Sequence, residues 1–342
     1  MPQKPKAEDD GYKTLGEALA SGKIGCFYIF HGEERYLLES GLAALRKALC
    51  PEGLDSFNYK RFDGRTLTIT DLDDAINTLP AFAERTLVEV HDFDIFKGEH
   101  NKALLGMFSD LPEYVCIVFI YDTIAYKPDG RLKINAGILK IAEVIAFSTQ
   151  EEHKLIKWIQ RHYADNGKQI ALEDAKYLSF ITGGHMTSLI GEIAKTSAYA
   201  INKTVTRADI DAVVTPILDA TVYNLSDALT RGDHTTAMAL LEELFQMREA
   251  PHRLMFSISL TMRRLLAARV CLDSGYGRNA FMDMSGIKKE YPAKLLMDAA
   301  RRMSTEKCRD FVLHCSDTAH RLNSVPEPEG QMIELIARLA LS

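Results

Sequence analysis

Residues 70–91, TDLDDAINTLPAFAERTLVEVH, place a short helical pattern, an apolar corner and a run of β-type residues directly after one another. Thr70 precedes a cluster of acids, which is typical of a helix start, and its hydroxyl can cap the free amides there. We therefore expect a helix from Thr70 to Asn77 with Thr70 as its cap. Pro80 cannot continue that helix. Thr86 to His91 has the composition of a strand. A helix that leads through a short corner into a strand is the repeating unit of an α/β fold.

The corner itself, Leu79 to Arg85, admits two interpretations. In the first, Leu79 and Phe82 fold back into the core, where large apolar side chains usually lie. In the second, Phe82 projects into solvent and anchors the chain in the hydrophobic pocket of a partner, since aromatic anchors dominate the binding energy of interfaces. The corner alone leaves both interpretations open.

Further β-type runs and helical patterns alternate on both sides of this segment, from Ile24 to about Ser148. Leucines at helical spacing (38, 42, 45 and 49) and the segment Lys102 to Phe108 predict helices between the strands. Such alternation predicts a parallel sheet with crossover helices, and therefore an α/β domain over residues 1–148. The expected strands are Cys26–Phe30, Phe57–Asp63, Thr86–His91, Val115–Tyr121 and Val144–Phe147, the third and fourth being apolar enough for burial on both faces.

Only helical patterns follow Ser148. Glycines at 167, 183 and 184 and a turn after Asn202 divide residues 149–215 into four short helices, which predicts a small helical domain. Pro216 marks the next junction, and residues 216–342 carry patterns typical of a helix bundle. The expected helices are Glu151–Asp165, Leu172–Thr182, Thr187–Ala200, Arg207–Val214, Ala220–Thr230, Thr235–Gln246, Pro251–Leu272, Glu306–Leu322 and Gln331–Leu341.

The composition is that of an ordinary globular protein, with 342 residues of which 46% are hydrophobic and 26% charged, and this length predicts two or three domains. The six cysteines form no C-x-x-C pair, which favours buried thiols in a reducing compartment over a zinc site or a disulfide framework. The amino terminus has no apolar signal region, and no run of about 18 apolar residues occurs. We therefore expect a cytoplasmic protein without membrane contact.

The turn after the first expected strand, His31-Gly32-Glu33-Glu34-Arg35-Tyr36, stands where an α/β nucleotide-binding domain has its phosphate loop. A P-loop requires G-x-x-x-x-G-K-[ST], because glycine amides cradle the phosphates, the lysine reaches them and the hydroxyl holds magnesium. Here one glycine is present, the lysine and hydroxyl are missing, and two acids occupy the position of the phosphate. Asp92 and Asp94 follow the third strand, and Asp122 alone follows the fourth. These features argue against nucleotide hydrolysis.

Other catalytic patterns are also missing from the sequence. There is no H-E-x-x-H metal motif, no G-x-S-x-G nucleophile elbow and no cysteine in a recognisable catalytic context. The histidines are widely spaced, as expected of surface or helix-capping residues. We therefore predict no catalytic residue, no metal and no cofactor.

Positive charge is concentrated between Arg248 and Arg302, where eleven Lys and Arg stand against five Asp and Glu, although the whole chain has a net charge of −6. The local excess of six can contact a phosphate backbone. A solvated helix face or a subunit contact explains it equally well. The candidate residues on the longest expected helix are Arg253, Arg263, Arg264 and Arg269.

Several segments resemble, in their order and spacing, the delta subunit of the bacterial DNA polymerase III clamp loader. Tyr28 to Glu39 is similar to that family's opening strand, glycine–acid turn and helix. Phe57-Asn58-Tyr59 resembles its second strand, and Leu79 to Val90 its helix–corner–strand segment. Later segments resemble its lid-like helices and the start of its collar domain; these are Trp158-Ile159 with Gly167 and Ile170, Gly191 to Lys195, Val222 to Ala228, Ala237 to Leu244 and Glu249 to Pro251.

The resemblance implies an AAA+-like protein of three domains that lacks ATP binding: an α/β domain (1–148), a lid-like helical domain (149–215) and a helical collar (216–342). It implies that the chain forms a clamp-loader pentamer with gamma/tau and delta-prime subunits. The resemblance further implies that this pentamer opens the beta sliding clamp and binds primer–template DNA during replication. The chain would then be a non-catalytic subunit of the DNA polymerase holoenzyme.

The resemblance also assigns a role to the corner. In that family an apolar residue followed by phenylalanine inserts into a hydrophobic pocket of the clamp. Phe82 falls on the aromatic position and Ala81 on its apolar neighbour. Because this neighbour is often larger than alanine, Leu79 or Pro80 is the candidate for the missing contact. The resemblance favours the exposed interpretation of Phe82.

Two alternatives stay open. One is an AAA+-like scaffold or interaction protein of DNA replication or repair that does not open the clamp, or that binds it through a flexible tail. Residues 1–13, which are charged, and the C-terminal helix do not resemble a clamp-binding peptide. The other is an active nucleotide-dependent ATPase, against which residues 31–36 argue.

Overall fold

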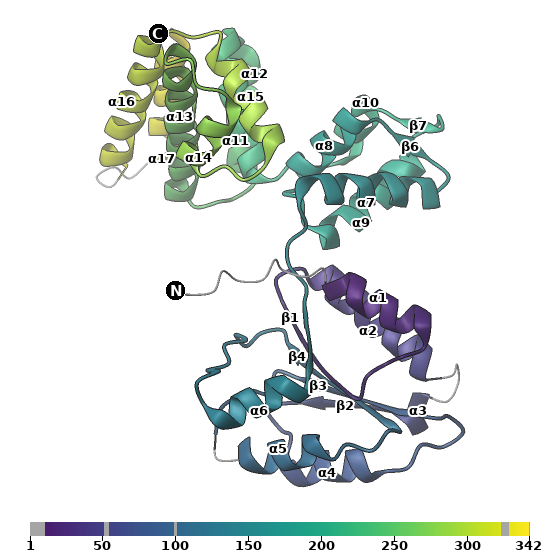
Figure 1. Cartoon of the computed structure of the whole chain (residues 1–342). Coiled ribbons are helices and arrows are strands. Elements are labelled where there is room, and N and C mark those ends of the chain that lie inside the picture. Colours follow the sequence, from purple (N-terminus) through teal and green to yellow (C-terminus); the bar gives the residue numbers. More distant parts are fainter. Residues whose placement is uncertain (1–10, 51–54, 99–100, 323–327, 342) are drawn as a thin grey trace. The chain divides into compact units, whose positions relative to one another are not determined.

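The computed structural model describes residues 11–50, 55–98, 101–322 and 328–341 (Figure 1). Its contacts divide the chain into two compact units, residues 1–150 and residues 151–342. The division of the second part into a lid-like domain and a collar at residue 215 stays a prediction. Residues 1–10, most of the charged N-terminal segment, lie outside the described ranges.

The first unit is built on a parallel sheet with the strand order β2-β3-β4-β1-β5. The central strands are β1 (Phe27–His31), β3 (Thr86–His91) and β4 (Val115–Tyr121), and the edges are β2 (Tyr59–Asp63) and β5 (Glu143–Ala146). All of β4 and all but the last residue of β3 are buried, as expected of parallel strands covered on both faces. The predicted α/β class with a parallel sheet is therefore confirmed.

Helices cover both faces of this sheet. On one side lie α1 (Gly11–Ser21) and α2 (Arg35–Leu49), and on the other lie α4 (Ile69–Asn77), α5 (Asn101–Ser109) and α6 (Lys133–Ile141) (Figure 1). Buried side chains of the second group form one hydrophobic core with alternate residues of the central strands. The sequence patterns did not predict α1 and α6.

The helix before the corner, α4, begins at Ile69, one residue earlier than predicted. Its N-cap is Thr68, whose Oγ1 accepts a hydrogen bond from the Asp71 amide (3.1 Å), while the Asp71 carboxylate accepts one from the Thr68 amide (3.2 Å). This reciprocal pair is a capping box. The prediction that Thr70 caps the helix is therefore wrong, although the helix ends at Asn77 as predicted.

The second strand is shorter than predicted. Phe57 and Asn58 belong to the short helix α3 (Asp55–Asn58), so β2 begins only at Tyr59. The other strands of the sheet agree with the predicted ranges to within one residue at each end.

The second unit begins with helices that agree with the predicted ones to within one residue at each end. They are α7 (Glu152–Asp165), α8 (Leu172–Ile181), α9 (Met186–Tyr199) and α10 (Arg207–Val213). A pair of two-residue parallel strands, β6 (Gln169–Ile170) and β7 (Thr204–Val205), joins the loops between them. The prediction that strands end at Ser148 is wrong in this detail.

The remaining helices pack around one core. They are α11 (Leu218–Arg231), α12 (His234–Gln246), α13 (Pro251–Asp273), α14 (Arg278–Ser285), α15 (Glu290–Ala300), α16 (Thr305–Arg321) and α17 (Pro328–Leu341). The sequence pattern predicts that one face of α13 packs inward, formed by Leu254, Ile258, Thr261, Leu265 and Ala268. All of these residues are buried except Thr261, and Met262 next to it enters the core instead. The sequence patterns did not predict α14 and α15.

The sequence also predicts buried cysteine thiols and no membrane-spanning segment. All six cysteines are free thiols, and five of them are buried, as predicted. Within the described ranges, no helix is both long enough and apolar enough to cross a membrane.

Candidate functional site

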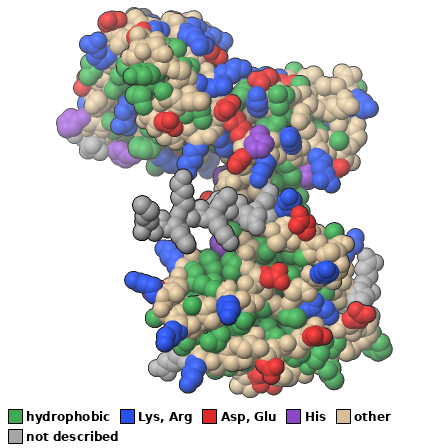
Figure 2. All heavy atoms as spheres, viewed as in Figure 1, with side chains coloured by type: hydrophobic (Ala, Val, Ile, Leu, Met, Phe, Trp, Pro, Cys, Tyr) green, Lys and Arg blue, Asp and Glu red, His purple; other side chains and the backbone are tan. Residues whose placement is uncertain are grey.

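The corner between α4 and β3 carries the two most exposed large hydrophobic side chains of the described part of the first unit. Phe82 is 82% exposed and Leu79 is 71% exposed, whereas Pro80 and Ala81 are partly buried. Hydrophobic side chains are visible at the edge of the unit where α4 ends (Figure 2). The interpretation in which Leu79 and Phe82 fold back into the core is therefore wrong.

The backbone of the corner is constrained at its tip. Phe82 has a φ angle of 60°, in the left-handed region that bulky residues rarely adopt. Such a conformation costs about 1–3 kcal/mol and persists only where the surrounding structure fixes it. Contacts on both sides of Phe82 supply that constraint.

On the amino-terminal side, Asn58 holds the peptide group of Ala81. Its Nδ2 donates a hydrogen bond to the Ala81 carbonyl oxygen (2.6 Å), and its Oδ1 accepts one from the Ala81 amide (2.7 Å). The Asn58 side chain is fully buried. Sequence reasoning missed this residue, although asparagine is depleted in strands and its position inside a predicted strand was a usable signal.

On the carboxyl-terminal side, Arg85 anchors the base of the corner to the starts of β1 and β4. Its guanidinium donates hydrogen bonds to the carbonyl oxygens of Ile24 (2.6 Å), Gly25 (2.9 Å) and Val115 (2.8 Å). Hydrogen bonds from a charged donor are stronger than neutral ones. The corner is thus held at both ends, and Phe82 lies between the two anchors.

The turn after β1 is occupied by the chain's own backbone. Gly32 has a φ angle of 133°, and a Cβ atom there would lie 2.2 Å from the Phe147 carbonyl oxygen. The amide of Glu34 donates to that same oxygen (2.9 Å), and the Glu34 side chain is buried. Arg35 forms an ion pair with Asp122 (2.8 Å). These residues do not fit a bound nucleotide phosphate.

The acids after β3 and β4 also have structural partners. The Asp92 carboxylate accepts hydrogen bonds from the amides of Asp122 (2.9 Å) and Thr123 (2.8 Å) and from the Thr123 hydroxyl (2.7 Å). Burial opposes the ionisation of Asp92, but these hydrogen bonds outweigh it and lower the pKa of the carboxyl group. Asp92 therefore braces the loop after β4. Among the residues that the structure describes, no three His, Cys, Asp or Glu side chains gather as a metal site.

The four candidate arginines of α13 do not form one site. At 3.6 residues per turn, Arg253 and Arg264 lie on one side of the helix and Arg269 on the opposite side. Arg253 pairs with Glu249 and Arg269 with Asp273, one turn away in each case. Neither Arg263 nor Arg264 forms an ion pair with a described residue. Two of the four charges are therefore compensated, one by Glu249 just before the helix and one by Asp273 at its last residue.

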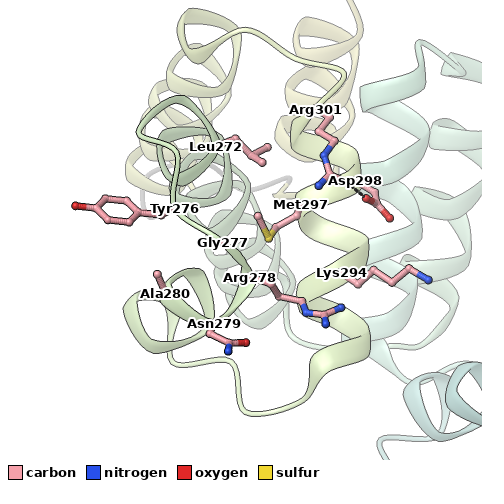
Figure 3. Close-up of a pocket in the computed structure, with 10 residues that line it drawn as sticks. All are labelled: Leu272, Tyr276, Gly277, Arg278, Asn279, Ala280, Lys294, Met297, Asp298 and Arg301. Carbon is pink, nitrogen blue, oxygen red and sulfur yellow. Dashed lines mark hydrogen bonds and ion pairs between the residues drawn. The ribbon is translucent and has the colours of Figure 1, made fainter.

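Other basic residues of this stretch line a pocket of about 660 Å³ between α15 and the turn before α14 (Figure 3). Arg301 pairs with Asp298, Lys294 with Glu173 (3.3 Å) and Arg278 with Glu290 (3.6 Å). Positive and negative side chains are correspondingly interspersed over the visible face of the second unit (Figure 2). Asp298 and Glu290 are already included in the count along the sequence, so of these three pairs only Lys294–Glu173 offsets part of the positive excess.

Comparison with known families places these features in context. The family model for the DNA polymerase III delta subunit matches residues 28–147, and the model for the C-terminal domain of that subunit matches residues 219–337. The chain belongs to the DNA polymerase III delta subunit family. The first match includes the corner, Asn58 and Arg85, and the second covers most of the helices from α11 to α17. The resemblance predicted from the sequence is confirmed.

Two relatives from this family align with most of the length of the chain. DNA polymerase III subunit delta of Bacillus subtilis is 24% identical over 331 residues, covering 93% of this chain and 94% of the relative. The probable subunit delta of Aquifex aeolicus is 20% identical over 297 residues, covering 84% and 83%. Among solved structures, the DNA clamp loader delta protein of Bacillus subtilis superposes with a TM-score of 0.58 at 20% identity, covering 97% of this chain and 100% of that one. The two proteins share a fold.

Proposed function

We propose that this delta-family chain binds and opens a sliding clamp by placing Phe82 in a hydrophobic pocket of the clamp, and that it does so without hydrolysing ATP. The observation that carries the proposal is the 82% exposure of Phe82 on a backbone held from both sides. A rigidly presented aromatic side chain loses little entropy on binding. The description of the Bacillus subtilis relative as a clamp loader delta protein supplies the class of partner.

Leu79 supplies the second apolar contact in this proposal. The Ala81 side chain is small and partly buried, and its peptide group is engaged by Asn58. Leu79 is 71% exposed on the same corner. Ala81 then contributes the backbone that orients Phe82, and Leu79 provides the apolar area that a larger neighbour would give.

The binding energy that the corner can supply is sufficient to shift a sliding clamp from its closed toward its open state. An aromatic side chain buries about 150–250 Å², and apolar burial stabilises by about 25 cal/mol per Å², so Phe82 and Leu79 together contribute a few kcal/mol. A ligand shifts a conformational equilibrium only by its differential affinity for the two states. The corner therefore opens the clamp to the extent that it binds the open ring better.

In this proposal the chain does not hydrolyse ATP because the turn at residues 31–36 leaves no room for a nucleotide phosphate. The Phe147 backbone packs against Gly32, and the carboxyl-bearing Glu34 is buried at the start of α2. Phosphate binding at a helix start requires free amides and room for the anion. In the assembled loader, partner subunits would supply nucleotide-dependent control.

Contact with DNA or a neighbouring subunit through α13 is a further part of the proposal. Arg263 is the best placed of the four candidates, because it is exposed and makes no ion pair with a described residue. The charges of Arg253 and Arg269 are already engaged by Glu249, which precedes the helix, and by Asp273 at its end.

The affinity of the full chain for its cognate sliding clamp, measured without nucleotide by surface plasmon resonance, tests the proposal. We expect Phe82→Ala to weaken binding by about 30-fold or more, the loss typical of an interface hot spot. Phe256→Ala is the matched control, since Phe256 is also a largely exposed phenylalanine (61%) but lies on α13. Circular dichroism establishes that each variant is folded.

Three outcomes distinguish the possibilities. Absence of wild-type binding would reject the proposal. Wild-type affinity in Phe82→Ala would keep clamp binding and move the contact elsewhere. An equal loss in Phe256→Ala would show that the effect is not specific to the corner.

A further inference from the structure

We infer that the clamp contact is built from two segments of the chain: Phe57 of α3 is a second ring of the surface around Phe82, and Asn58 is the positioning residue that fixes Phe82 in its exposed orientation. This inference rests on the proposed function, because it assigns further residues to the same clamp contact.

Phe57 and Phe82 form a pair of exposed aromatic rings. Their centroids lie 6.2 Å apart and their planes are inclined by 79°, an edge-to-face arrangement that aromatic rings favour. Phe57 is 54% exposed in spite of this contact. The two rings form a contiguous exposed apolar surface, and Leu79 adds a third exposed apolar side chain to the same corner. Contiguous exposed patches mark interaction sites more often than single residues do.

The sheet explains why two segments more than twenty residues apart meet here. β2 and β3 pair in parallel, with Tyr59 opposite Leu87. Helix α3 immediately precedes β2, and the corner immediately precedes β3. Because the amino ends of parallel neighbours lie at the same edge of a sheet, the two segments are adjacent wherever this pairing forms.

Asn58 joins the two segments by hydrogen bonds and so holds the tip in one orientation. Its amide group satisfies both the N–H and the C=O of Ala81, directly before the left-handed Phe82. Removal of the amide would leave buried polar groups without partners. Since Asn58 is fully buried, it cannot touch the clamp, and its effect on binding passes through Ala81 to Phe82.

The role of Phe57 is tested by a double-mutant cycle on clamp affinity with Phe57→Ala, Phe82→Ala and the double variant. We expect Phe57→Ala to weaken binding by about tenfold, within the range of secondary interface residues. The double variant should lose less than the product of the two single effects, because residues in contact are coupled. Phe256→Ala again serves as the control.

The outcomes separate the two proposals. If Phe57→Ala binds like wild type while Phe82→Ala does not, the second ring is overturned and the proposed function stands. If wild type does not bind the clamp at all, the proposed function fails, and this inference fails with it. Strictly multiplicative losses would contradict the paired-ring surface.

The role of Asn58 is tested by the pH dependence of Asn58→Asp. A protonated carboxyl group has the shape of the amide and can both donate to the Ala81 carbonyl and accept from its amide, whereas a carboxylate can only accept. Burial raises the pKa of a carboxyl group, so the variant should regain this pair as the pH falls. We expect its affinity relative to wild type to be reduced by about tenfold or more at pH 8 and to recover toward pH 5.

A purely structural role of Asn58 would give a different pattern. If Asn58 positions Phe82, the loss caused by Phe82→Ala should be smaller in the Asn58→Asp background at pH 8 than at pH 5, because a displaced ring contributes less. Circular dichroism at each pH shows whether the variant is folded. A deficit that does not change with pH, or wild-type affinity throughout, would overturn the positioning role.

Discussion

At the scale of single residues, a buried carboxylate stabilises the sheet next to the corner. Glu89 in β3 is fully buried and accepts hydrogen bonds from Arg46 (2.9 and 3.0 Å) and from the Tyr59 hydroxyl (2.9 Å). The His91 Nε2 lies 3.5 Å from it. Burial opposes the ionisation of Glu89, but the groups of His91, Tyr59 and Arg46 outweigh burial and lower its pKa. Glu89 thus ties α2 and β2 to the strand that leaves the corner.

This arrangement predicts an acid-dependent stability of β2 and β3. Because the folded pKa of Glu89 is below its ordinary value of 4.5, its contribution is fully present above that pH and is lost as the pH falls through the lowered value. We expect Glu89→Ala to cost about 3 kcal/mol at neutral pH, since it leaves the Arg46 charge without its buried partner.

Hydrogen exchange of the β2 and β3 amides is the suitable measurement for this prediction, because the single tryptophan, Trp158, reports on the second unit. The ratio of protection between wild type and Glu89→Ala should shrink as the pH is lowered below the folded pKa. A ratio of one at neutral pH, or a ratio that is independent of pH, would contradict the assigned role of Glu89.

At the scale of elements, sequence patterns predict the bounds of a helix or strand correctly where contacts between residues close in sequence determine them. The apolar runs of β3 and β4 gave their bounds without error. Helix α15 was not predicted because Pro292 resembles a helix breaker, yet it stands in the first turn, where the missing N–H is no loss. Helix α3 was taken for part of a strand because the partner of Asn58 lies 23 residues further along the chain. No local pattern contains that contact.

The candidate site likewise contains features that the sequence predicted and features that it did not. The corner sequence alone left the exposure of Phe82 undecided, and the family resemblance favoured it. The residues that hold the corner, Asn58 and Arg85, bind backbone groups that are distant in sequence. Backbone groups are the same in every residue, so the sequence does not reveal which backbone groups Asn58 and Arg85 bind. The only local signal is an asparagine inside a predicted strand, and it does not identify the partner.

The capping box of α4 provides a prediction at this scale. Thr68→Ala removes the hydroxyl that accepts from the Asp71 amide and should destabilise the helix by about 1 kcal/mol, the usual cost of losing an N-cap. Thr70→Ala is the control, since Thr70 is exposed in the first turn and does not cap the helix. Hydrogen exchange of the α4 amides should be faster in the first variant only. Equal effects of the two substitutions would mean that the cap does not determine the stability of α4.

At the scale of the whole molecule, net charge along the sequence overstated the basic character of the second unit. The window from Arg248 to Arg302 excludes two of the acids that compensate it. Glu173 pairs with Lys294, and Asp227 pairs with Arg302. Surface pairs of this kind contribute little to stability, but they reduce the attraction that the stretch exerts on phosphate. Among the described residues, Arg248, Arg263 and Lys288 of this stretch are exposed and form no ion pair, so Arg263 is the one of the four candidate arginines that stays available for a DNA or subunit contact.

The whole chain should also act on a clamp without nucleotide. A preference of about 2.8 kcal/mol for the open ring raises the open population about a hundredfold, and the apolar corner can supply a preference of this size. We therefore expect the full chain alone to accelerate the release of a labelled sliding clamp from circular DNA, with the same rate whether ATP is present or not. Phe82→Ala should return release to its basal rate, and Phe256→Ala should not. Release that requires ATP would contradict the proposal of a nucleotide-independent subunit, whereas tight binding without release would separate clamp binding from clamp opening and assign the opening step to the assembled complex.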